Sequence, residues 1–240
     1  MGSGTEVAKE ASDFVLLDDS FSNIVNAIEE GRGIYDNIQK SIMLLLSGNL
    51  GEVLIVFLAV ISGMNLPLTA ILLLWINMVT DGAPALAYSV DPYGTDIMSR
   101  PPKPRDEGIL PGPKLALISF AGLVGTGIGL FLFSWHGGNS ASHDDLILAQ
   151  TMVFNFIVLY EIILVFIIRR AYQVPLFSNK WIWASVVLSV LLQAMLMYTP
   201  MHLPFSIVPL AWPEIMNLFF GGLVFYATFW VYNLISRPSS

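Results

Sequence analysis

The residues best suited to chemistry are oxygen-bearing side chains within two neighbouring apolar stretches. In the first stretch, Asn49 and Glu52 are three residues apart and therefore share one face of a helix. In the second, Asn77, Thr80 and Asp81 have the spacing i, i+3 and i+4, again on one helical face. Such oxygens are the ligands of hard cations, and Ca²⁺ takes about six to eight of them. The two faces together predict a cation site.

Neighbouring residues favour the same interpretation. Pro84 follows Asp81 closely, and because proline has no N–H we expect free carbonyl oxygens near Asp81. Glu161 lies in the middle of a later apolar stretch and is a further candidate ligand; the alternative is a protonated or helix-bonded glutamate. Glu52 could likewise be a protonated carrier in counter-transport. The chain has no cysteine and only three histidines, which do not cluster, so zinc and copper fit poorly.

The composition predicts that most of these residues lie in lipid. The chain is 55% hydrophobic and 12% charged, whereas a soluble domain is about 25% charged. So few charges cannot cover a water-facing surface of this size. The formal net charge of −7 also argues against a nucleic-acid partner. We therefore expect an all-α integral membrane protein with the lipid bilayer as its main partner.

Six stretches have the roughly 20 apolar residues that a membrane-crossing helix needs. Their ranges are 42–62, 66–88, 115–133, 146–168, 181–198 and 215–235. The first two are separated only by Gly63-Met64-Asn65, which predicts an antiparallel hairpin. This hairpin would bring the two oxygen-rich faces together near the middle of the membrane.

The distribution of lysine and arginine predicts the orientation. All 11 of these residues fall before the first span, in the second and fourth connections or after the last span. Positively charged connections stay in the cytoplasm, and an even number of spans puts both termini there. The sequence therefore predicts a multi-pass protein with cytoplasmic termini, which we place in the plasma membrane.

The first 35 residues differ in kind from the rest. Residues 14–17, Phe-Val-Leu-Leu, are typical of a short buried strand, and residues 18–20 offer helix caps before an amphipathic run. One strand and one helix cannot enclose a core. We therefore expect this segment to be the edge of a larger cytoplasmic domain, so that the chain is a truncated or split product.

Several motifs resemble those of calcium-type P-type ATPases. Residues 1–13, 18–21 and 29–32 resemble the end of the phosphorylation domain, which has a HAD-like α/β fold. The stretch Asn49-Leu50-Gly51-Glu52 resembles the ion-binding part of the family's fifth membrane helix, and residues 74–82 resemble that of the sixth. Residues 96–102 resemble the cytosolic loop that follows. The resemblance covers the whole chain and is specific up to about residue 110.

The resemblance implies a role for each region. Asn77 and Asp81 would bind the transported ion, Ca²⁺, with Asn49, Glu52 and Thr80 as further ligands. A long helix starting near Gly33 would couple the phosphorylation domain to the site. The implied divisions are 1–35 (remnant of the phosphorylation domain), 36–90 (ion-binding hairpin), 91–114 (cytosolic loop), 115–235 (four-helix membrane domain) and 236–240 (tail).

Two departures from the family limit what this chain could do alone. It has no Asp-Lys-Thr-Gly-Thr phosphorylation motif. The phosphorylated aspartate and the domains that bind ATP and Mg²⁺ would therefore lie in a missing N-terminal half, and we expect no ATPase activity from these residues alone. Arg169 and Arg170 stand where two-calcium members carry a carboxylate, so a positive charge could replace one ion.

The sequence thus predicts the C-terminal membrane half of an ATP-driven pump that exports Ca²⁺ from the cytoplasm. Two alternatives stay open. One is a stand-alone secondary cation transporter or channel that uses Glu52, Asp81 and Glu161. The other is a non-catalytic membrane subunit. Manganese, sodium or protons are other possible cargoes, because oxygen ligands suit several hard cations.

Overall fold

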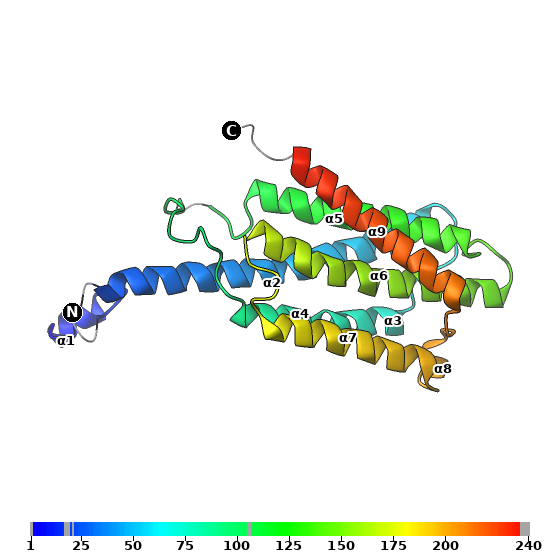
Figure 1. Ribbon diagram of the computed structural model, residues 1–240, viewed down its shortest axis with the longest axis horizontal. Helices are drawn as coiled ribbons and strands as arrows, with labels where there is room; N and C mark the ends of the chain where they lie inside the picture. The colour runs from blue at the N-terminus through cyan, green and yellow to red at the C-terminus, as the bar shows by residue number, and fades with distance from the viewer. Residues whose placement is uncertain (1, 17–19, 21, 105–106, 236–240) are drawn as a thin grey trace.

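All regular structure in the described part of the chain is helical (Figure 1). The computed structural model describes residues 2–16, 20, 22–104 and 107–235, with side chains up to residue 232. In chain order, the elements are α1 (Glu6–Glu10), α2 (Ser22–Ile61), α3 (Ala70–Trp75), the π-helix η1 (Ile76–Thr80), α4 (Gly82–Ala87), the 3₁₀ turn η2 (Tyr88–Val90), α5 (Gly112–Trp135), α6 (His143–Ala171), α7 (Lys180–Tyr198), α8 (His202–Phe205) and α9 (Trp212–Ile235).

Six helical segments are long and apolar enough to cross a membrane, which confirms the predicted number. They are Ser22–Ile61, Ala70–Val90, Gly112–Trp135, His143–Ala171, Lys180–Tyr198 and Trp212–Tyr232. Each contains most of one predicted span. Helix α6 is the central one, because 72% of its most apolar stretch is buried, against 28–44% in the other five. It packs against α2, α5 and α9.

Specific backbone motifs end two of these helices at the turns. Gly63 has a φ of 71° after α2, and Gly137 has a φ of 92° after α5. In each case the next residue donates its N–H back to a carbonyl five positions earlier, Met64 to Ala59 and Gly138 to Phe133. Glycine favours such C-terminal caps because it has no Cβ to clash at positive φ. The resulting tight turn after α2 produces the predicted hairpin.

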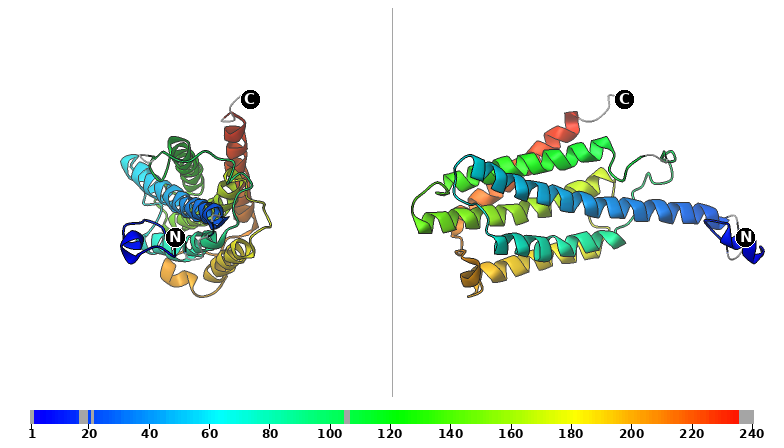
Figure 2. Two further views of the ribbon diagram at one scale, coloured as in Figure 1. Left: turned by 90° about the vertical axis from the view of Figure 1, so that its left-hand side faces the viewer. Right: turned by 180° about the vertical axis from the view of Figure 1, so that it is seen from behind.

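The N-terminal segment differs from its prediction in two ways. Residues 14–16 form no strand, and Phe14 is 60% exposed; residue 17 lies outside the described part. The described residues include no second strand with which residues 14–16 could pair. The long helix begins at Ser22 rather than near Gly33, because no proline interrupts this stretch and Gly33 is covered by the ring of Tyr93. Figures 1 and 2 show α2 projecting beyond the bundle.

The second span is not one regular helix. After α3, the backbone widens into η1, where the N–H of Asp81 bonds to the carbonyl of Ile76, five residues earlier, at 3.0 Å. Helix α4 then starts at Gly82. Pro84 cannot donate to the carbonyl of Thr80, and this carbonyl instead accepts from Ser189 at 3.5 Å. The predicted disruption near Asp81 is confirmed, in the form of a π-helix, a feature frequent at functional sites.

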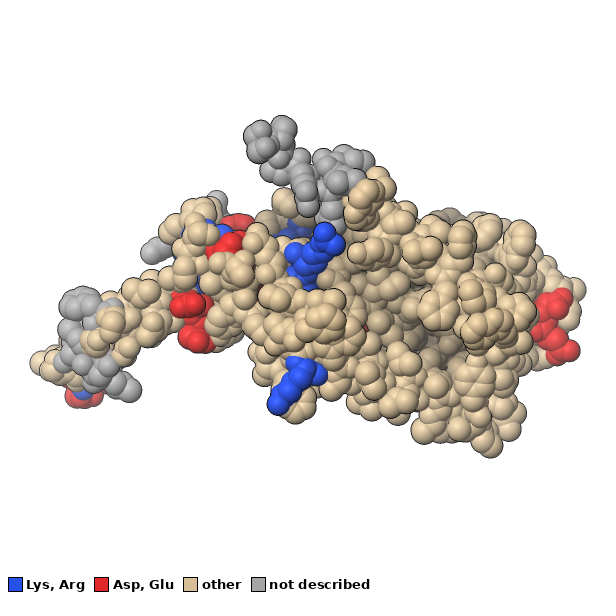
Figure 3. Space-filling model, viewed as in Figure 1, with Lys and Arg blue, Asp and Glu red and all other residues tan. Residues whose placement is uncertain are grey.

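The outer surface of the bundle suits a bilayer. Large apolar side chains of α9 such as Phe219, Phe220 and Leu223 are each more than 60% exposed. In Figure 3 a broad, almost uncharged area of the bundle lies between the Lys and Arg side chains near the middle of the view and the acidic side chains at its right end. Large contiguous apolar surfaces of this kind are typical of a membrane-facing surface.

Candidate cation site between three helices

The predicted meeting of the hairpin's two polar faces is confirmed. The Asn77 amide donates to Glu52 Oε2 at 2.9 Å and to its own helix at the Leu73 carbonyl, also at 2.9 Å. Glu52 is 4% exposed. The hydrogen bond fixes one carboxylate oxygen of α2 against η1, and it leaves the Asn77 amide oxygen free to accept or to bind a cation.

A third helix brings Glu161 to the same place. A Cβ added at Gly48 of α2 would lie 2.7 Å from Glu161 Oε1 and 3.5 Å from Asp81 Oδ2. The Glu161 carboxyl therefore reaches the surface of α2 beside Asp81. Asp81 and Glu161 are 1% and 3% exposed. The structure thus joins Glu161, the additional candidate, to the hairpin residues.

Several oxygens in this cluster have no hydrogen-bond partner. They are Oε1 of Glu52, Oδ2 of Asp81 and both carboxyl oxygens of Glu161. A buried carboxylate without partners is costly, because it loses its hydration without compensation. Asp81, between η1 and α4, and Glu161 of α6 also repel each other if both are ionised. A positive charge between them would relieve both effects.

Two buried hydroxyl groups, of Thr80 and Tyr160, directly precede Asp81 and Glu161 in the chain. The Thr80 hydroxyl is 4% exposed and donates to the carbonyl of Ile76 at 2.9 Å, so its lone pairs remain available. The Tyr160 hydroxyl donates to the carbonyl of Gly48 at 3.2 Å, which holds α6 close to the glycine surface of α2. Within the described residues, no three Asp, Glu, His or Cys side chains are placed to hold a metal ion by themselves. Amide, hydroxyl or carbonyl oxygens would therefore be needed as well.

Asn49 does not join this cluster. Its side chain is exposed, and its amide donates to the Leu45 carbonyl of the same helix at 2.7 Å. Helical spacing places Asn49 about 60° from Glu52 around the axis of α2, and α6 covers the Glu52 side. The role of Asn49 as a ligand stays a prediction.

A second buried cluster was not predicted from the sequence. This cluster lies at the end of the bundle that carries the lysines and arginines, here called the basic end. Asp91 follows η2, and its carboxylate accepts from Lys40 Nζ at 2.8 Å, from Arg169 Nε at 3.1 Å and from Asn179 at 2.9 Å. The side chains of Lys40, Asp91 and Arg169 are at most 1% exposed. The sequence offers one indication of this cluster: each of the three charges stands next to a predicted span end on the same side.

Arg169 makes several further hydrogen bonds. Besides Asp91, its guanidinium donates to the carbonyls of Leu176 at 2.7 Å and Pro175 at 3.0 Å, and to the Ser178 hydroxyl at 2.9 Å. Arg169 is therefore bound to the α6–α7 connection and to Asp91. Its position is about 12 Å along α6 from Glu161, and the replacement of an ion by Arg169 or Arg170 stays a prediction.

Further ion pairs surround the basic end. Arg100 binds Asp36 of α2 at 2.5 Å, and this hydrogen bond raises the pKa of Arg100 further above its ordinary value. Arg32 donates to the carbonyls of Ile97 and Arg100, both at 2.8 Å. The connection between η2 and α5 is thus bound along the projecting part of α2.

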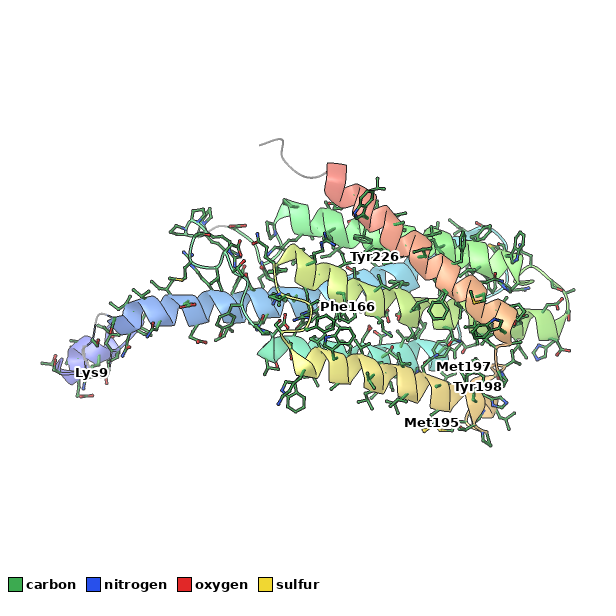
Figure 4. All side chains as sticks on the ribbon, in the orientation of Figure 1. Lys9, Phe166, Met195, Met197, Tyr198 and Tyr226 are labelled. Atoms are coloured by element: carbon green, nitrogen blue, oxygen red, sulfur yellow. The ribbon has the colours of Figure 1, made fainter. Side chains whose placement is uncertain are left out.

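The other membrane-buried amides bond helices together. Gln193 of α7 accepts from Trp75 at 3.0 Å and donates to Asn155 of α6 at 3.0 Å, so it joins α7 to α3 and to α6. At the far end of α7, Tyr198 donates to the Leu210 carbonyl at 3.1 Å. Figure 4 places Tyr198 there beside Met195 and Met197, at the opposite end of the molecule from Lys9.

The fold and the site together define a class: an integral, multi-pass membrane protein whose buried acidic cluster is formed by three of its spans. A family model described as "Cation transporting ATPase, C-terminus" matches residues 65–235. The chain belongs to this family.

Curated relatives agree with the family. The chain is 38% identical over 214 residues to Calcium-transporting ATPase 1 of Bacillus cereus, covering 82% of this chain and 24% of that protein. It is 40% identical over 204 residues to the Calcium-transporting ATPase of Bacillus subtilis, covering 82% and 22%. It is 34% identical over 255 residues to the Endoplasmic reticulum calcium ATPase srcA of Aspergillus fumigatus, covering 89% and 25%. The chain thus spans about a quarter of the length of these relatives.

Proposed function

We propose that this chain forms the C-terminal membrane part of an ATP-driven pump that exports Ca²⁺ from the cytoplasm. The observation that carries the proposal is the meeting of Asp81 and Glu161 at Gly48 of α2, one turn from Glu52, with four buried oxygens of these three carboxyls that have no hydrogen-bond partner. Ca²⁺ prefers oxygen ligands in flexible geometry. Relatives at 34–40% identity are named calcium-transporting ATPases.

In this proposal Ca²⁺ is the cargo, and its ligands come mainly from the chain described here. Asp81, Glu52 and Glu161 provide carboxylate oxygens, Asn77 an amide oxygen and Thr80 a hydroxyl. Asn49, on the exposed side of α2, binds only together with groups from outside these residues. The three carboxylates hold a divalent ion where neutral ligands alone would not repay its dehydration.

The energy for transport comes from outside residues 1–240. ATP and Mg²⁺ bind to the other domains of the pump, and the phosphorylated aspartate lies there too. Residues 1–35 are the edge of the HAD-like phosphorylation domain, and α2 connects them directly to Glu52. Both termini face the cytoplasm of a plasma-membrane pump, because positively charged connections are retained on that side.

The decisive experiment changes Asp81 to Asn in a complete pump that carries this membrane part. Asparagine keeps the shape and removes the charge, so Ca²⁺-dependent phosphorylation by ATP should be abolished. Asp144→Asn is the matched control, because Asp144 is exposed in the first turn of α6. Unchanged calcium dependence in the Asp81 variant would remove Asp81 from the ligands. Cation flux by this chain alone in liposomes would favour a stand-alone transporter instead.

A further inference from the structure

One buried carboxylate at the basic end joins the same three helical segments that carry the candidate ligands. Lys40 lies on α2 with Glu52, Arg169 lies on α6 with Glu161, and Asp91 directly follows the broken second span that carries Asp81. Asp91 accepts from Lys40 at 2.8 Å and from Arg169 at 3.1 Å. Each helical segment therefore has one member in the carboxylate cluster and one in this triad.

The triad lies two to more than three helical turns from the cluster on all three segments. At 1.5 Å per helical residue, Lys40 is about 18 Å from Glu52, Asp91 about 15 Å from Asp81 and Arg169 about 12 Å from Glu161. A shift of one segment along its axis would separate at least one ion pair. The triad therefore restricts the relative heights at which the three carboxyls can stand.

Asp91 has no spare bonding capacity. Its two carboxylate oxygens serve Lys40, Arg169 and Asn179, and its backbone carbonyl accepts from Asn37 of α2 at 2.8 Å. Two buried cations face this single anion. Moving any of the three helical segments would break an ion pair of this network. That would leave a buried charge without a partner, which is strongly destabilising. No lysine or arginine bond in the triad reaches the carboxylate cluster, so any influence on ion binding passes through helix position.

We propose that Asp91 is a positioning residue: by pairing with Lys40 and Arg169 it fixes α2, the broken span and α6 at the heights that bring Glu52, Asp81 and Glu161 together. This inference rests on the proposed function only for its consequence, cation affinity. Its geometric content, the alignment of the three helical segments, stands apart from what the site binds.

The test variant is Lys40→Met. Methionine fills similar space, and the remaining Asp91–Arg169 pair is neutral, so the chain should still fold. Only the link to α2 is weakened. The chain has no cysteine, so spin labels can be placed cleanly at Ile38→Cys, Leu86→Cys and Arg170→Cys, which are all exposed. Distances between label pairs are then measured in the full 240-residue chain in lipid nanodiscs.

The expected result is selective. Lys40→Met should broaden the distance distribution of the Ile38–Leu86 pair and leave the Leu86–Arg170 pair narrow. Arg169→Met should do the reverse. Asp96→Asn is the matched control, because Asp96 on the same connection makes only a half-exposed pair with Arg100, and it should change neither pair. Narrow distributions in both Met variants, or equal broadening of both pairs in each, would overturn the proposal.

A second measurement separates this inference from the proposed function. Binding of radioactive Ca²⁺ to the same nanodiscs should weaken about 10- to 100-fold in Lys40→Met and Arg169→Met, as for other residues that position metal ligands. If selective broadening occurs but no form of the chain binds Ca²⁺, the proposed ligand set fails and the positioning role stands. If Ca²⁺ binds equally to all variants, the positioning role is wrong and the proposed site stands.

Discussion

Two clusters of buried charged residues lie in the same three helical segments, and they are built in opposite ways. At the basic end, Asp91 is saturated by Lys40, Arg169 and Asn179. Nearer the middle of the spans, Glu52, Asp81 and Glu161 have buried oxygens without a hydrogen-bond partner, and no lysine or arginine in the described part of the chain pairs with them. A saturated cluster stabilises one arrangement of helices. An unsaturated one costs stability and is retained where a ligand is bound, so the contrast separates structural charges from functional charges.

The largest test of this contrast is Asp91→Ala. Removing the carboxylate leaves Lys40 and Arg169 buried without a partner, so the free energy of unfolding should fall by about 3–5 kcal/mol. Unfolding of the detergent-solubilised chain, followed by tryptophan fluorescence, gives this value. The control is Asp96→Ala, which breaks a half-exposed pair worth about 1 kcal/mol at most. Equal effects of the two substitutions would mean that the Asp91 cluster is not structural.

Glu161→Gln should act with the opposite sign on stability. The amide replaces one buried carboxyl and can donate a hydrogen bond to Asp81. In the absence of Ca²⁺ the free energy of unfolding should therefore rise by about 1 kcal/mol. The substitution should instead weaken the binding of Ca²⁺. Ca²⁺ at 100 times its dissociation constant should stabilise the unmodified chain by about 2.7 kcal/mol, and this gain should be lost in the variant. Thermal unfolding with and without Ca²⁺ measures both effects. A loss as large as that of Asp91→Ala in the absence of Ca²⁺ would contradict the contrast.

Gly48→Ala should disturb the acidic cluster without touching its carboxyls. The new Cβ would lie 2.7 Å from Glu161 Oε1, and this flexible carboxyl must move. We expect Ca²⁺ affinity to fall about tenfold, or 1.4 kcal/mol, with little loss of stability because alanine favours the helix. Gly31→Ala on the same helix is the control, since its Cβ would meet nothing within 4 Å. If the two variants bound Ca²⁺ with equal affinity, Glu161 would not be a Ca²⁺ ligand. Calorimetric titration with Ca²⁺ distinguishes them.

The acidic cluster was largely predictable from the sequence, and the basic one was not. Glu52, Asn77 and Asp81 could be found because costly polar residues inside apolar stretches, at helical spacing, stand out in a single chain. Lys40 and Asp91 could not, since a charge at a span end is ordinary and its burial depends on which helices pack together. The six spans followed from hydrophobicity. The N-terminal strand failed because a strand needs a partner, and the described residues contain none.

Asn49→Ala is the smallest predicted effect and tests where the site ends. Asn49 is exposed and bonded only to its own helix, so stability should change by no more than about 0.5 kcal/mol. Ca²⁺ affinity of the chain alone should not change, and the matched Asn77→Ala should weaken it, because Asn77 bonds to Glu52 at 2.9 Å. In a complete pump the same Asn49 substitution should lower Ca²⁺ affinity, if groups from other segments reach the exposed side of α2. A loss of affinity in the chain alone would instead require Asn49 to turn toward the carboxyls, and the boundary drawn between the two faces of α2 would be wrong.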